Sequence, residues 1–164
     1  MLFVVLANPQ GYKTIEDFAK LVYTMFSNSM MILSNPQGSA IQNGIPILSR
    51  IALQSSRTFG VISNLSELLE VFPNIAKVYF VDILSNSFPV KQLEEAIREI
   101  DYKNNDIAIV FAESSSRELH EVKAFSKNIA TVIDTGSLKS LTLSSKASII
   151  LYKIKEIHEG NSTL

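Results

Sequence analysis

Short apolar runs recur along the chain, and within each run the apolar residues are continuous rather than alternating with polar ones. Continuous apolar runs of this length are typical of strands that are buried on both faces of a parallel sheet. We therefore predict six strands, over residues 2–7, 30–34, 58–62, 77–82, 107–112 and 130–134.

Amphipathic segments with helix-start signals lie between these runs. Thr14, with Asp17 three residues later, is predicted to cap the first helix, and Pro46 and Pro89 are predicted to open two others. The remaining helix signals are Asn64 with Glu67, residues 117–125 and residues 141–157. Strands that alternate with helices predict an α/β fold with a mostly parallel six-stranded sheet flanked by helices. We expect one domain over residues 1–157 and a polar tail over residues 158–164.

A parallel α/β sheet binds its ligands beyond the carboxyl ends of its strands. The loops to inspect are therefore residues 8–13, 35–44, 113–116 and 135–140. We identify no internal repeat, linker or charge block that would divide the chain.

The amino-acid composition limits the binding partners and the cellular location that we expect. The chain is 46% hydrophobic and 19% charged, which predicts an exposed apolar patch and a homo-oligomer. It has 15 Lys plus Arg against 16 Asp plus Glu, so RNA binding would need a local basic patch. It has no cysteine, which excludes disulfides and thiolate zinc sites and favours a cytoplasmic location. The apolar start has no cationic leader and is too short to span a membrane, so no membrane partner is expected.

Several candidate motifs have simpler interpretations. The six glycines fit neither a dinucleotide fingerprint nor a P-loop. His120 and His158 lie far apart among charged neighbours, so we interpret them as surface residues and predict no metal site. Asp134-Thr135-Gly136 matches the aspartic protease signature, but those enzymes are all-β, and Asp134 is better explained as a strand-end residue. Glu121 and Lys123 could serve a nuclease, although a solvated helix face explains them more simply.

Two segments in the second half of the chain resemble a known family. "IVFAESSSREL" followed by "VIDTGSLKSLTLSSKASIILY" resembles the second and third motifs of the SpoU branch of the SPOUT RNA methyltransferases. Residues 4–52 are similar to that branch as well, and especially to a small archaeal group of unknown function sometimes labelled RecB-family nuclease. "DFAKLVY" and the loop from Gly38 to Pro46 carry this similarity.

The resemblance implies a carboxy-terminal trefoil knot, a homodimer packed around it, and S-adenosylmethionine bent into the knot as cofactor. In such a site Gly136 would allow close backbone approach, and the early N–H groups of the last helix would donate to the ligand. The positions that match the family's cofactor cradle are Ala112, Glu113, Ser114, Ile133, Thr135, Gly136, Ser140, Leu141 and Thr142.

The resemblance also implies transfer of a methyl group to a ribose 2′-hydroxyl of RNA, such as tRNA or rRNA, by direct displacement and without a metal. Where the family has Asn, Arg and Asn, this chain has Thr14, Lys20 and Thr142, and Glu113 lies one residue before the position of the family's Glu. Lys20 and Glu113 are the predicted catalytic side chains. The altered motifs leave two alternatives open: a silent dimer that binds RNA or protein, and a metal-dependent nuclease.

Overall fold

The computed structural model describes residues 1–83, 85, 87–113 and 120–160 of the chain. Its centre is a seven-stranded sheet in the order β3-β2-β1-β6-β4-β7-β5, and every pair of neighbouring strands is parallel. The strands are β1 (Leu2–Ala7), β2 (Ser29–Ser34), β3 (Phe59–Ile62), β4 (Ile75–Val81), β5 (Val90–Gln92), β6 (Asp106–Ala112) and β7 (Ala130–Asp134). The α/β class and the parallel sheet are thus confirmed, with all carboxyl ends at one edge.

The prediction of six strands was wrong by one. Pro89 was expected to open a helix, but the residues after it form β5, and helix α4 begins only at Leu93 (Leu93–Glu99). β5 pairs in register with β7 as the last strand of the sheet, and the side chain of Val90 is 58% exposed. A strand this short and exposed carries no continuous apolar run, so the pattern used for the other six strands did not detect it.

The helices follow the predicted order with changes at their ends. They are α1 (Tyr12–Met25), α2 (Ile45–Gln54), α3 (Leu68–Val71), α4 and α5 (Leu143–Glu159), with a π-helix over Ala40–Gly44 and 3-10 helices over Leu65–Glu67, His120–Ala124 and Gly136–Ser140. Thr14 is not the cap of α1, because the helix begins two residues earlier and Thr14 donates its hydroxyl proton to Glu113 instead. Asn64 does cap the turn that precedes α3, as predicted. Of the helix predicted over residues 117–125, the described part is the 3-10 helix.

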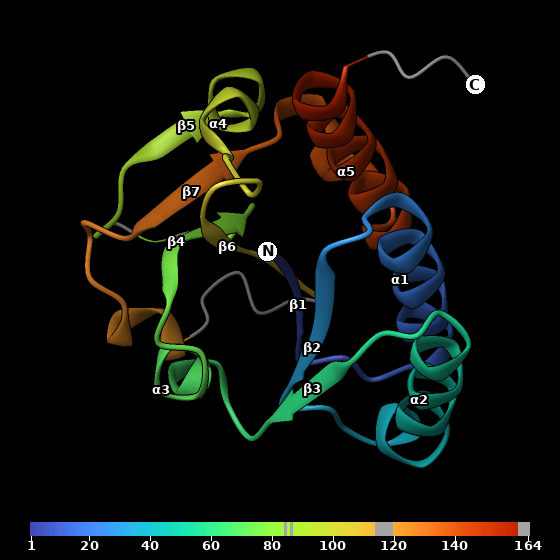
Figure 1. Cartoon of the computed structure of the whole chain (residues 1–164). Helices are drawn as coiled ribbons and strands as arrows, with labels where there is room; N and C mark the ends of the chain where they lie inside the picture. Colours follow the sequence, from blue (N-terminus) through green and yellow to red (C-terminus); the bar gives the residue numbers. More distant parts are fainter. Residues whose placement is uncertain (84, 86, 114–119, 161–164) are drawn as a thin grey trace.

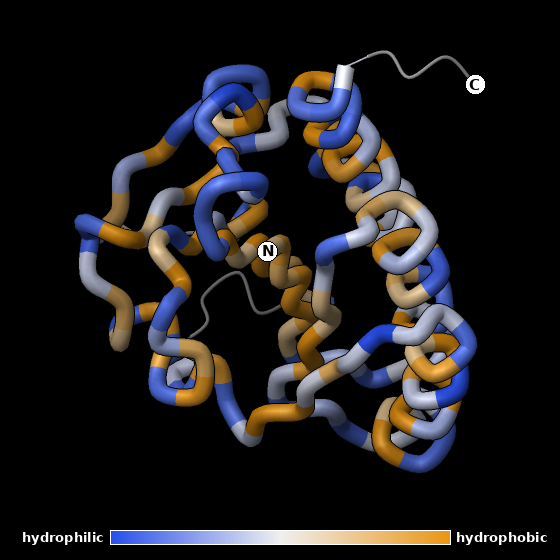
Figure 2. The backbone as a smooth tube through the Cα atoms, in the orientation of Figure 1, coloured by the Kyte–Doolittle hydropathy of each residue, from blue (hydrophilic) through white to orange (hydrophobic). Residues whose placement is uncertain are grey.

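The sheet separates two apolar cores, which gives three layers (Figure 1). Side chains of β1 alternate between them: Leu2, Val4 and Leu6 pack with α1, α2, α4 and α5, while Phe3 and Val5 pack on the opposite side with α3. Figure 2 shows hydrophobic residues concentrated in the central strands. Both faces of β1 are fully buried, which explains its unbroken apolar run.

Among the described residues, no helix is long and apolar enough to cross a membrane. Of the tail predicted over residues 158–164, His158 and Glu159 continue α5, and residues 161–164 lie outside the described part.

Candidate functional site

Three strands end in a left-handed residue at the carboxyl edge of the sheet. Asn8 follows β1 with φ of 52°, Asn35 follows β2 with φ of 49°, and Asp82 follows β4 with φ of 54°. Left-handed backbone at residues other than glycine is uncommon, and it concentrates at functional sites when the surroundings hold it in place. This edge is therefore the part of the molecule in which to look for a site.

Glu113 lies at the end of β6 and joins three elements. One carboxylate oxygen accepts a hydrogen bond from the backbone N–H of Gln10 at 2.9 Å, and the other accepts from the Thr14 hydroxyl at 3.0 Å. Its own backbone N–H donates to the carbonyl of Ala7 at 3.1 Å. The structure thus brings Glu113 and Thr14 together at the start of α1, two positions that sequence analysis matched separately to the family.

Lys20, the other predicted catalytic side chain, does not join them. Its ammonium group pairs with Glu16 at 2.7 Å, and the Lys20 side chain is 60% exposed. Thr14, which Glu113 contacts, precedes Lys20 by six residues, about 9 Å along the helix axis. The structure therefore does not place Lys20 in the hydrogen-bond network of Glu113.

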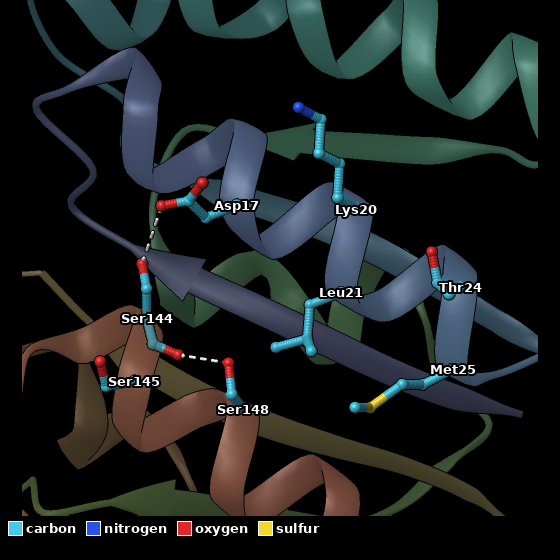
Figure 3. A pocket seen from close by; sticks show the side chains of 8 residues that line it. All are labelled: Asp17, Lys20, Leu21, Thr24, Met25, Ser144, Ser145 and Ser148. Atoms are coloured by element: carbon cyan, nitrogen blue, oxygen red, sulfur yellow. Dashed lines mark hydrogen bonds between the residues drawn. The ribbon is translucent and has the colours of Figure 1, made fainter. Parts of the chain in front are cut away.

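Lys20 instead borders a groove of about 470 Å³ between α1 and α5. The groove is lined by Asp17, Lys20, Leu21, Thr24 and Met25 of α1 and by Ser144, Ser145 and Ser148 of α5 (Figure 3). The Ser144 hydroxyl lies 3.5 Å from a carboxylate oxygen of Asp17. Figure 3 shows the Lys20 amine reaching away from the serines and the Leu21 and Met25 side chains on the side of α1 that faces α5, so the groove combines serine hydroxyls and a carboxylate with apolar side chains.

A buried ion pair ties the end of β4 to the start of α5. The ammonium group of Lys146 lies 2.8 Å from a carboxylate oxygen of Asp82, and both side chains are 11% exposed. Thr135 completes the network, since its N–H and its hydroxyl donate to the two oxygens of Asp82 at 3.0 and 2.5 Å. Sequence reasoning missed this network because its members come from three separate segments. The only signal was a lysine among the apolar residues of the last helix.

The loop after β7 is fixed by a second carboxylate. Asp134 pairs with Lys139 at 2.7 Å and accepts a hydrogen bond from the N–H of Gly136 at 2.9 Å. The Lys139 ammonium, and then the Gly136 N–H, lower the pKa of Asp134 below its ordinary value of 3.8. Asp134 is thus the strand-end residue that the sequence predicted.

Beside this loop lies a groove of about 340 Å³ that includes two residues of the predicted cofactor cradle, Thr135 and Gly136. Gly136 has φ of +57°, and a Cβ added there would have no heavy atom within 4 Å. The other lining residues are Gln92, Leu93, Glu94, Asp134, Ser137, Leu138, Ile149 and Lys153.

The remaining members of the predicted cradle have other positions. Ala112 and Glu113 end β6, which β4 separates from β7 in the sheet, and Ser114 lies outside the described residues. Ile133 is fully buried, and its carbonyl accepts a hydrogen bond from the N–H of Asp82 at 2.9 Å. The others precede the last helix: the Ser140 hydroxyl donates to the carbonyl of Ser137, Leu141 is 40% exposed, and Thr142 caps α5.

The histidines and the candidate nuclease residues lie apart from these grooves. The His158 ring nitrogen lies 2.8 Å from the carbonyl oxygen of Ile97, and its ring packs on Tyr102, so His158 is part of the α4–α5 contact. His120, Glu121 and Lys123 share the 3-10 helix before β7. No group of three or more His, Cys, Asp or Glu residues that could hold a metal occurs in the part of the chain that the structure describes.

An apolar groove of about 460 Å³ continues the α1–α5 groove, with which it shares Met25 and Ser148. Its other lining residues are Ile149, Tyr152, Lys153 and Glu156, and the Tyr152 side chain is 52% exposed. This surface matches the exposed apolar patch that the composition predicted.

Residues 38–153 match the family model described as RecB-family nuclease (DUF2122). The chain belongs to this family. The match includes the π-helix, the Asp82–Lys146 pair and the loop after β7, and it ends within α5. No curated protein matches the sequence significantly.

Several solved structures have a similar fold. TrmJ from Z. mobilis superposes with a TM-score of 0.69 at 18% identity, over 95% of this chain and 69% of TrmJ. A structure that addresses the 2-OH methylation of C/U34 on tRNA superposes with a TM-score of 0.69 at 21% identity, over 98% of this chain and 97% of that one. The SpoU methyltransferase AviRb from Streptomyces viridochromogenes, in complex with AdoMet, superposes with a TM-score of 0.66 at 13% identity. The superposition covers 95% of this chain and 60% of AviRb. The predicted resemblance to the SpoU branch is confirmed at the level of the fold.

Proposed function

We propose that this protein binds S-adenosylmethionine in the groove beside the loop after β7 and methylates a ribose 2′-hydroxyl of RNA. The observation that carries the proposal is Gly136. Its left-handed backbone lines the groove, and its missing side chain would point into open space. Glycine at such a position lets a ligand approach the backbone closely.

The residues around Gly136 fit this cofactor. Leu93, Leu138 and Ile149 offer apolar surface for an adenine ring. Glu94 and Asp134 place carboxylates beside the groove, and each is paired with a lysine, Lys153 and Lys139, so the lining offers both charges to the amino and carboxylate groups of the cofactor. The fit supports a binding site for S-adenosylmethionine at the end of β7, the edge at which α/β sheets bind ligands.

S-adenosylmethionine would supply an electrophilic methyl group on its sulfonium. The chain's own task would then be to align the acceptor hydroxyl and to take its proton. Glu113 suits that task, because each of its oxygens accepts one hydrogen bond in the structure and a carboxylate oxygen can accept about two. Lys20 is the second proposed side chain, and its ammonium group would have to leave Glu16 to reach an acceptor.

We further propose that the carboxy-terminal segments form a trefoil knot. The strand order supports this, because β6 inserts between β1 and β4, and β7 then inserts between β4 and β5. We also propose a homodimer through the apolar groove between α1 and α5, where Tyr152 is half exposed. Sedimentation velocity should show a dimer that Tyr152→Glu dissociates. Leu53→Glu, at an exposed leucine on α2, should leave the dimer intact.

The family description favours a second candidate function, a metal-dependent nuclease. The prediction for it is magnesium-dependent cleavage of nucleic acid that Glu121→Gln abolishes. Cleavage that persists in this variant would assign the activity to other residues or to a contaminant.

Isothermal titration calorimetry with S-adenosylmethionine tests the primary proposal. We expect micromolar binding that Gly136→Val abolishes, because the new side chain would occupy the groove. Gly160→Val is the matched control: Gly160 has φ of +72° and open space around its Cβ position, so it carries similar backbone strain at the end of α5. Absence of binding to folded protein would overturn the proposal. Binding without methylation of any RNA would instead identify a catalytically silent relative.

A further inference from the structure

The tetrapeptide Asn-Pro-Gln-Gly occurs twice, at residues 8–11 and 35–38. The copies directly follow the neighbouring parallel strands β1 and β2. Sequence analysis identified no internal repeat and missed this one, because it is only four residues long. The sheet places the two copies side by side at the carboxyl edge.

The two copies begin with the same backbone conformation and hold each other, although they differ at their glycines, since Gly11 has φ of −108° and Gly38 has φ of +53°. Both asparagines are left-handed, and the side-chain amide of Asn35 donates to the side-chain oxygen of Asn8 at 2.8 Å. The backbone N–H of Gln37 donates to the carbonyl of Pro9 at 2.9 Å, and that of Ala40 donates to the carbonyl of Gln10 at 3.1 Å. The pair is therefore a built platform rather than two independent turns.

The π-helix Ala40–Gly44 begins two residues after the second copy and packs on α1. Gly44 packs against α1 so closely that an added Cβ would lie 2.4 Å from the Ile15 Cδ1 atom. Short π-helices and left-handed residues are both locally unfavourable, and they persist mostly at functional sites. Such backbone within two neighbouring loops points to a function beyond connecting strands to helices.

What the platform presents to solvent is polar, neutral and aromatic. Gln10 and Gln37 are exposed, and within the described residues neither side-chain amide takes part in a hydrogen bond. Tyr12, the residue after the first copy, is 43% exposed. The nearby Lys13 is engaged by Glu16 and Asp17 at 3.4 and 3.3 Å, so its charge is partly neutralised. This chemistry suits a planar group with donors and acceptors better than it suits a bare phosphate.

We propose that the paired Asn-Pro-Gln-Gly turns read the bases of a single-stranded RNA segment, with Gln10 and Gln37 as the reading groups and Tyr12 as a stacking surface. A glutamine amide matches the donor and acceptor edge of adenine, and exposed aromatic rings stack on unpaired bases. The N–H of Gln10 bonds directly to Glu113, so the bases would bind next to the proposed acceptor site. This inference rests on the proposed RNA function and names the chemistry that would select the RNA.

Fluorescence anisotropy with short labelled RNAs of A, C or U tests the platform. We expect the wild type to prefer the A oligomer by about tenfold, and Gln10→Ala with Gln37→Ala to remove that preference. Tyr12→Ala should weaken binding to all three oligomers by about tenfold. Gln54→Ala, at an exposed glutamine ending α2, is the matched control and should change nothing.

Gln10→Glu with Gln37→Glu keeps the size of both side chains and replaces each NH2 donor with an acceptor oxygen. A carboxylate accepts from the amino group of cytosine, so this variant should shift the preference from A toward C. The inference is overturned if the wild type shows no base preference, or if the Ala double variant retains it. Calorimetry on the same samples keeps the two proposals apart. A wild type that binds S-adenosylmethionine but shows no base preference contradicts the platform inference alone. A wild type that shows base preference but does not bind S-adenosylmethionine contradicts only the proposed methyltransferase.

Discussion

The loops after β1 and β2 and the loops after β4 and β7 share one edge of the sheet, but different chemistry holds them. In the first pair, neutral groups join the two loops to each other, as in the hydrogen bond between the amides of Asn35 and Asn8. Among the described residues, the charged Glu113 accepts only from the N–H of Gln10 and the hydroxyl of Thr14. In the second pair, charges make them: Asp82 with Lys146, and Asp134 with Lys139. The loops after β1 and β2 also expose the side-chain amides of Gln10 and Gln37 to solvent. The loops after β4 and β7 instead use their charged side chains to fix their own backbone.

This difference predicts different effects of substitution in the two halves. Neutral amides are suited to reading a polar partner, because their donors and acceptors can be exchanged with it at little desolvation cost. A buried ion pair holds backbone in place, and it is costly to break because the remaining charge stays buried. We therefore expect substitutions in the β4–β7 loops to affect stability most, and substitutions of the exposed amides to affect recognition.

The largest effect should come from Lys146→Met. Removing the ammonium group leaves the Asp82 carboxylate buried without its charge partner, which costs about 3–5 kcal/mol of unfolding free energy in comparable pairs. Urea denaturation of the wild type and of Lys146→Met measures this loss of unfolding free energy. Lys155→Met on the same helix, in a more exposed pair at 3.8 Å from Glu159, should cost less than about 1 kcal/mol.

Asp82→Asn combined with Lys146→Met should recover part of the lost stability, because neither charge then remains buried. If Lys146→Met were no more destabilising than Lys155→Met, the buried pair would not hold the β4–β7 loops, and the contrast between the two halves would fail.

A smaller effect is expected at the π-helix of the first half. Gly44 has φ of −71°, so Gly44→Ala is free of backbone strain, and helix propensity alone would make it favourable. The close approach to Ile15 should reverse that sign and destabilise the protein by roughly 1–3 kcal/mol. Ile15→Val would shorten the obstructing side chain, so the double variant should lose less than the sum of the single variants. Thermal unfolding of all three variants would show additive losses if the two residues did not touch.

The left-handed turn of the first copy predicts a difference between two variants at one position. Asn8→Gly loses the amide hydrogen bond to Asn35 but tolerates φ of 52°. Asn8→Ala loses the same bond and also places a Cβ in the left-handed region, which costs about 1–2 kcal/mol. The Ala variant should therefore unfold at a lower urea concentration than the Gly variant. Equal midpoints would mean that the turn relaxes and that the paired geometry is not enforced.

The sequence predicted the parts of this fold that depend on local patterns. Continuous apolar runs located six strands, and Asn64 and Pro46 marked the turn before α3 and the start of α2. Val90–Gln92 escaped because an exposed three-residue strand has no such run. Thr14 looked like a cap because its spacing to Asp17 fits one, but a carboxylate 99 residues away takes its hydroxyl.

The candidate site shows the same limit. Thr135 and Gly136 could be predicted because a family motif marks them, and both line the groove. The Asp82–Lys146 pair could not, because its residues lie 64 positions apart and each is unremarkable in its own segment. The repeated Asn-Pro-Gln-Gly was visible in the sequence, but its significance depends on β1 and β2 being neighbours, which only the sheet order shows.

The smallest predicted effect concerns the exposed pair that fixes the loop after β7. The folded state lowers the pKa of Asp134 below 3.8 through Lys139 first and the N–H of Gly136 second. A carboxyl group with a lowered folded pKa stabilises the protein above its unfolded pKa, and this contribution is lost as the pH falls through the folded value. Lys139→Ala should therefore be slightly less stable than the wild type near neutral pH and should match it in strong acid.

Nuclear magnetic resonance titration of the Asp134 carboxyl carbon is the direct measurement. In Lys139→Ala the pKa of Asp134 should rise toward 3.8 but stay somewhat below it, because the Gly136 N–H still donates. Lys155→Ala should leave the titration unchanged. An unchanged pKa in Lys139→Ala would mean that the backbone, rather than the lysine, holds this loop, and the β7 loop would then resemble the neutral turns of the first half.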